Sequence, residues 1–281
     1  MIGGNARLVA LAQEFLDREF SGRDFSGRER LGRRTDLAGL ARLRVRLDEG
    51  FCRAVADHFA RQPTLTWDGD LARRYRLFQA ENLRQYRAIV AAGIRIRPWL
   101  RTGQPYRDSR HLCASVRDTS TLYVYLTRDG HGPGSAANPG NDHGTRAGQP
   151  DVAAGWHPMR EPAGVRLSGV DLCHNDVFRA VHDVFGHAMF GNSMGPVGEF
   201  RAAYCHLALY PPDAHPVLFT EQVSQICWFF FGPHLRGHTG RVPDRGAPDW
   251  IPPARRPYPE QKVFACPPEF LDRFTGSFVK E

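Results

Sequence analysis

The chain has 281 residues, of which 42% are hydrophobic and 24% are charged, a composition typical of a globular protein rather than a disordered or membrane-embedded one. The formal net charge is +7, and the basic residues are nearly all arginines. Their densest group, in residues 28–34, alternates with acidic residues and lacks the neighbouring aromatic side chains of a single-strand binding platform. We therefore expect no nucleic-acid partner.

The cysteines and the apolar segments bear on the compartment. The six cysteines are far apart and none forms a Cys-x-x-Cys pair, which argues against a zinc ribbon. No stretch approaches 18 uncharged apolar residues, and residues 1–13 lack a long apolar signal segment. These features predict a cytoplasmic protein with reduced thiols and no membrane contact.

The first third of the sequence has helical patterns. Helices are expected over residues 6–20 and 36–60, separated by a turn rich in glycine and arginine. A clearer helix is expected over residues 70–92, where one stripe carries Leu71, Tyr75, Phe78, Asn82, Gln85 and Ile89. We therefore divide the chain into a helical N-terminal arm, residues 1–69, and a larger domain, residues 70–281.

Strand patterns follow this helix. Residues 94–96 form a short alternating segment, and residues 121–127 are rich in β-branched and aromatic side chains, as strands are. Residues 130–155 are crowded with Gly, Pro, Asn and Asp. Because a loop this long in a compact domain is usually functional, we expect a lid over a binding site.

The last part of the chain is again helical in pattern. Asn175 or Asp176 is expected to cap a helix whose apolar side includes Phe178, Val181 and Phe185. Further helices are expected over residues 196–210 and 216–231. The predicted fold class is thus mainly α (α+β), a helical domain with a small sheet.

Two histidines in this part have a spacing that suggests a metal site. His182 and His187 are five residues apart, so an ideal α-helix would separate them by about 140°. Gly186 precedes the second histidine and would let the backbone turn its imidazole back towards the first. This arrangement predicts a metal site held by His182 and His187.

Other polar side chains accompany the histidines. Glu199 and His206 are seven residues apart and share a face of the second helix, and Glu221 shares a face of the third with Trp228. Ionised carboxylates are seldom buried unless they are paired or bound to a cation. Glu221, Glu199 and His206 are therefore candidate ligands beside His182 and His187, in a metal site between the C-terminal helices.

A structural interpretation remains open beside this one. A histidine on an apolar face is most often a satisfied core residue, and either glutamate could pair with an arginine. Four more histidines are expected in loops or behind the ligands, namely His157, His174, His234 and His238.

The segment from His182 to His187, followed by an aromatic helix around Trp228, resembles the iron site of the aromatic amino acid hydroxylases. In that family two histidines and a later glutamate bind iron, a reduced pterin supplies electrons, and O2 is activated. When the tryptophan helices are matched, the glutamate position falls on Gly232. The carboxylate is then expected from Glu221, or in second place Glu199, and the identity of the reductant stays open.

A longer resemblance covers most of residues 75–270. The segment from Asn175 to Ala188, Asn-Asp-Val-Phe-Arg-Ala-Val-His-Asp-Val-Phe-Gly-His-Ala, resembles that of a group of uncharacterised bacterial and phage proteins. This resemblance implies a coherent domain with a shared site and names no substrate.

Three functions follow from these patterns. A pair of imidazoles with one carboxylate and open positions is the facial triad of non-haem Fe(II) oxygenases, so our first hypothesis is a hydroxylase-like monooxygenase using Fe(II) and O2 on a small molecule, an amino acid or aromatic compound. The second is a metal-dependent hydrolase, because His182-Asp183 is the dipeptide of HD-type phosphohydrolases. The third is a non-enzymatic protein that binds an acidic partner.

Overall fold

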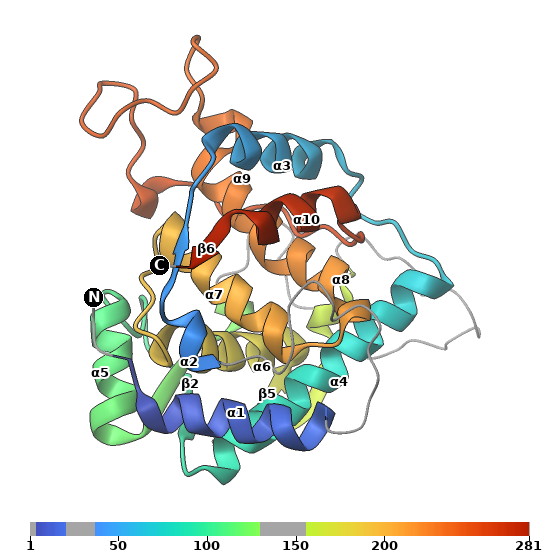
Figure 1. Cartoon of the computed structure of the whole chain (residues 1–281), viewed down its shortest axis with the longest axis vertical. Helices are drawn as coiled ribbons and strands as arrows, with labels where there is room; N and C mark the ends of the chain where they lie inside the picture. The colour runs from blue at the N-terminus through green and yellow to red at the C-terminus, as the bar shows by residue number, and fades with distance from the viewer. Residues whose placement is uncertain (1–3, 21–36, 130–155, 281) are drawn as a thin grey trace.

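The computed structural model describes residues 4–20, 37–129 and 156–280 (Figure 1). The segment at 130–155, for which a lid was expected, and the turn at 21–34 lie outside the described residues. The described part is mainly helical with three two-stranded sheets, which confirms the fold class. No helix in this part is long and apolar enough to cross a membrane.

The helices of the N-terminal part are α1 (Ala6–Phe20), α2 (Leu37–Leu40), α3 (Glu49–Arg61) and α4 (Gly69–Ala91). All six side chains of the stripe expected on α4 are buried. The single helix expected over 36–60 is instead divided, because Asp48 caps α3 by accepting the Phe51 N–H and residues 43–45 form a strand. Side chains of α1, α3 and α4 belong to one hydrophobic core with the C-terminal helices.

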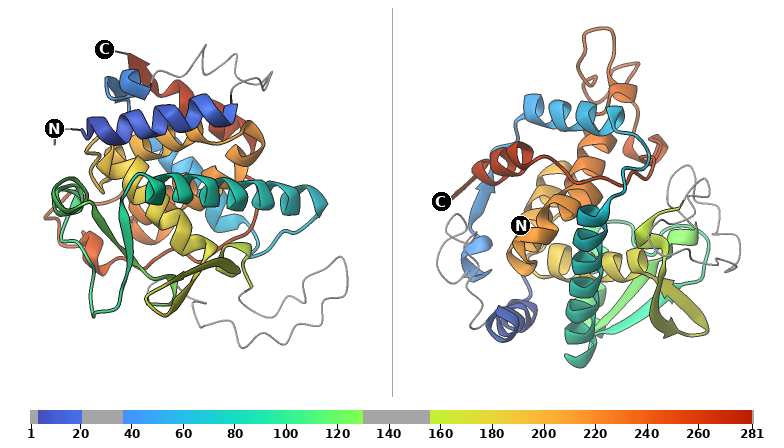
Figure 2. Two further views of the ribbon diagram at one scale, coloured as in Figure 1. Left: turned by 90° about the horizontal axis from the view of Figure 1, so that it is seen from below. Right: turned by 90° about the vertical axis from the view of Figure 1, so that its right-hand side faces the viewer.

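The strands are short and form pairs. Strand β1 (Leu43–Val45) lies antiparallel to β6 (Phe278–Lys280), which joins the N-terminal part of the chain to its last described residues. The pair β2 (Arg95–Trp99) and β3 (Thr121–Tyr125) is parallel and is connected by α5 (Ser109–Thr119), as parallel pairs require a crossover. The hairpin of β4 (Pro162–Leu167) and β5 (Val170–Cys173), which was not expected, lies at the edge of the molecule (Figure 2).

The C-terminal helices surround the middle of the molecule. Helix α6 (His174–Val181) continues into a π-helical segment, η4 (His182–Ala188). Helix α7 (Pro196–Leu209) packs against η4 and lies between α6 and α10 (Pro268–Gly276) in Figure 1. Helix α8 (His215–Phe219) continues through a second π-helical segment, η6 (Thr220–Ser224), into α9 (Gln225–Phe231).

Helix α6 starts two or three residues earlier than expected. Cys173 is the N-cap, and the Asp176 carboxylate receives the Cys173 N–H at 3.0 Å. The same carboxylate receives the backbone N–H and the hydroxyl of Thr127, each at 2.7 Å. Asp176 therefore fixes the start of α6 to the segment that follows β3, and this contact helps to set the position of the histidines further along the helix.

Candidate metal centre

The π-helical segment η4 brings His182 and His187 together. In such a segment the backbone N–H of one residue bonds to the carbonyl five residues earlier, as Met189 does to Val184 at 2.9 Å. Residues five apart then lie above one another, and the Nε2 atoms of the two imidazoles are 2.9 Å apart. The helix thus continues through Gly186, where the sequence suggested that it would turn.

Gly186 serves a packing purpose. A Cβ atom at this position would lie 3.1 Å from the Ala202 Cβ, the His182 Nδ1 and the His206 Nε2. Glycine therefore allows α7 to approach η4 closely, and this close approach places the ligands of the two helices together.

Glu199 completes the group from the first turn of α7. Its Oε2 lies 3.4 Å from His182 Nε2, and its Oε1 lies 3.4 Å from His187 Nε2. The three ligand atoms all lie within 4.8 Å of one another, and this is the one such group of His, Cys, Asp and Glu side chains in the described part of the chain. Glu199, the second choice from the sequence, is therefore the carboxylate beside the histidines.

These separations fit a bound metal ion. Bonds of about 2.1 Å that enclose angles between 90° and 109° place neighbouring ligand atoms about 3.0 to 3.4 Å apart. Here the two Nε2 atoms are 2.9 Å apart, and each lies 3.4 Å from one of the two Glu199 carboxylate oxygens. The donor set of two nitrogens and one oxygen suits iron or zinc.

Groups outside the ligand set orient the two imidazoles through their Nδ1 atoms. His187 Nδ1 lies 3.0 Å from the Asn192 carbonyl oxygen, which accepts its proton and leaves Nε2 free for a metal. His182 Nδ1 lies 3.1 Å from the side-chain amide of Gln222 and 3.2 Å from His206 Nε2. Gln222 was missed by the sequence reasoning, although it is adjacent to Glu221.

The electrostatics of the metal-free site favour an ion pair. Burial opposes a charge on His187, but the Glu199 carboxylate outweighs this effect and raises the pKa of His187 to about 9. Burial likewise opposes a charge on Glu199, but His187 and His182 hold its pKa well below its usual range. A metal ion would therefore replace a proton shared by these side chains.

Two of the expected ligands, His206 and Glu221, lie outside the group formed by His182, His187 and Glu199. His206 stacks on His182, with ring centroids 5.3 Å apart. Burial is the main cause that lowers the pKa of His206 well below its ordinary value, and the neighbouring imidazoles lower it further. Glu221, the first choice from the sequence, accepts a hydrogen bond from Tyr75 at 2.5 Å and lies outside the group. The physical reason is η6, because its wider turn directs Gln222 towards His182 in place of Glu221.

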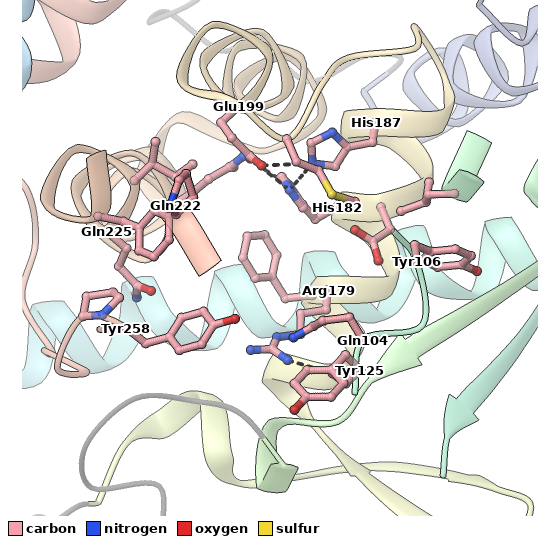
Figure 3. A pocket seen from close by; sticks show the side chains of 18 of the residues that line it. Gln104, Tyr106, Tyr125, Arg179, His182, His187, Glu199, Gln222, Gln225 and Tyr258 are labelled. Carbon is pink, nitrogen blue, oxygen red and sulfur yellow. Dashed lines mark hydrogen bonds and ion pairs between the residues drawn. The ribbon is translucent and has the colours of Figure 1, made fainter. Parts of the chain in front are cut away.

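A cavity of about 600 Å³ opens over the three ligands. The close-up shows Arg179, Tyr125, Tyr258 and Gln225 around this space, with the histidines and Glu199 at one side of it (Figure 3). Arg179 donates to the Tyr125 carbonyl at 2.7 Å, and this bond fixes its guanidinium at the wall. The arrangement can hold a small organic molecule against a bound metal.

No protein-family model, curated protein or solved structure matches this chain significantly.

Proposed function

We propose that this protein is a mononuclear non-haem Fe(II) oxygenase that activates O2 on a small molecule. The observation that carries the proposal is the convergence of His182, His187 and Glu199 beside a cavity, the donor set of the facial triad. Two neutral imidazoles and one carboxylate leave the other coordination positions of the ion open. Fe(II) held there would supply redox chemistry with O2.

The chain's own residues would then prepare the reaction. Phe178, Phe229 and Phe230 line the cavity and keep it apolar, which excludes water from the reacting groups. Arg179 and Tyr258 present polar atoms that orient the substrate. The unpaired state of all six cysteines supports a reducing, cytoplasmic compartment.

The metallohydrolase is the alternative that the same ligands support, because two histidines and a glutamate also bind catalytic zinc. An HD-type centre would in addition use the carboxylate of Asp183. Asp183 lines the cavity, but it is absent from the ligand group of the described residues. This absence favours the oxygenase over the HD-type enzyme.

The test begins with metal binding. Protein loaded anaerobically with Fe(II) should hold about one ion per chain, and Glu199→Ala and His187→Ala should each lose it. Nitric oxide should bind to the loaded iron and give the spin-3/2 resonance of an iron site with an open position, and the loaded protein should consume O2 when ascorbate is the reductant.

Each arm can refute the proposal. A chain that holds no metal would be the non-enzymatic protein with internally satisfied histidines. A chain that binds zinc, does not bind nitric oxide when loaded with iron, and hydrolyses a phosphate ester would be the hydrolase.

A further inference from the structure

Glu221 is a carboxylate in the cavity wall that the metal centre does not use. Its side chain is 2% exposed, and it lies beside equally buried His157. Oε1 accepts the Tyr75 hydroxyl at 2.5 Å and lies 3.4 Å from His157 Nε2. Oε2 has a weaker partner, the Gln225 amide at 3.4 Å.

Three polar side chains surround Glu221, namely His157, Tyr75 and Gln225. His157 accepts the Met159 N–H at its Nδ1, which places the imidazole proton on Nε2, facing Glu221. At 3.4 Å His157 Nε2 makes no hydrogen bond to Glu221, whereas Tyr75 and Gln225 donate to it. Both carboxylate oxygens therefore act as acceptors, and among the described residues no arginine or lysine forms an ion pair with Glu221.

A buried carboxylate without a cation is costly, since an uncompensated charge loses its hydration. A ligand in the cavity can bring positive charge to the weakly bonded Oε2, which faces no arginine or lysine ion-pair partner among the described residues. The adjoining wall carries Phe229, Phe230 and Tyr258, and aromatic faces attract ammonium groups.

We propose that Glu221 is the recognition residue for a protonated amine, and that the substrates of this cavity are small amines whose ammonium group donates to Oε2. This inference rests on the proposed function, because it names the substrate class of the same cavity. It also gives Glu221 a role in binding substrate, where the sequence suggested a role in binding metal.

The experiment compares matched probes on zinc-loaded protein, so that neither iron nor O2 enters the result. Binding of phenethylamine, 2-phenylethanol and 3-phenylpropionate is measured by calorimetry at neutral pH. The amine should bind about tenfold or more tightly than the alcohol, as a charge-assisted hydrogen bond implies. Glu221→Gln keeps the shape and removes the charge, so it should abolish this preference while retaining one zinc per chain.

The control is Glu269→Gln, which removes an exposed carboxylate on α10 and should leave the preference intact. Should Glu221→Gln fail to fold, Glu221→Asp withdraws the carboxylate by one methylene and should reduce the preference. The inference is overturned if amine and alcohol bind equally, if neither binds, or if the Glu221 variant keeps the preference. Loss of zinc in Glu221→Gln would also overturn it, whereas loss of metal in Glu199→Ala concerns the proposed function alone.

Discussion

Replacing Gly186 with alanine tests whether close packing of α7 on η4 assembles the metal centre. The added methyl group would lie 3.1 Å from three atoms, including His182 Nδ1 and His206 Nε2. Carbon atoms pack best about 3.5 to 4.0 Å from their neighbours, so the rings must move by several tenths of an ångström. The change therefore displaces a metal ligand without removing one.

The expected energies have opposite signs. Overpacking a well-packed interior costs about 1–3 kcal/mol, whereas alanine improves on glycine within a helix by about 1 kcal/mol. The free energy of unfolding should therefore fall by about 2 kcal/mol at most. Metal affinity should fall more clearly, by about tenfold or more, because disturbing the groups that orient metal-binding histidines costs about that much in other metal sites.

The assay is competition between the protein and a chelator for zinc, together with a denaturant titration of the metal-free chain. Gly276→Ala, at the end of α10, is the matched control, because nothing lies within 4 Å of its added methyl group. The control should bind zinc like the original chain. If Gly186→Ala also did so, the packing of α7 on η4 would not position the ligands.

The remaining predictions concern individual side chains of the site. Glu199→Gln should abolish stoichiometric metal binding, while Glu221→Gln should retain it; metal analysis giving the reverse would restore the sequence-based choice. Gln222→Leu removes the amide behind His182, and its metal affinity should fall about tenfold or more; unchanged chelator competition would show that the amide has no such role. In metal-free protein the pKa of His187 is raised from 6.5 to about 9, so its ion pair stabilises the fold fully below about pH 6.5 and is lost as pH rises through 9. Metal affinity should rise over the same interval, because the metal displaces the proton; a flat denaturation midpoint and a flat affinity would contradict the pair.

The sequence predicted those features that depend on local patterns. The apolar stripe of α4 and the β-branched run of β3 were visible because burial repeats with the period of each element. The hairpin of β4 and β5 was missed. Strand β1 was assigned to a helix, because its pairing with β6 joins residues more than 230 positions apart in the chain. Such pairings are tertiary and leave a weak mark on a three-residue segment.

The candidate ligands were predicted only in part, because local patterns show the residue types but not how the helices turn between them. His182 and His187 were recognisable as chemistry, but their joint use of one metal conflicted with an ideal helix. Glu221 and Glu199 were ranked by helical faces, and that ranking assumed 3.6 residues per turn throughout. In η6 this assumption fails, and Gln222 contacts His182 at the position that was expected for Glu221.

The spacing of the histidines could have indicated η4 in advance. If two side chains five residues apart must reach one ion, the helix has to place them above one another, and a π-helical turn does so without ending the helix. A π-helical turn has less favourable backbone geometry than an α-helical one. The close packing of Gly186 against Ala202 offsets part of this free-energy cost. A second widened turn brings the Gln222 amide to His182 and leaves Glu221 at the cavity wall, so the two π-helical segments together separate the metal ligands from the residue we assign to the substrate.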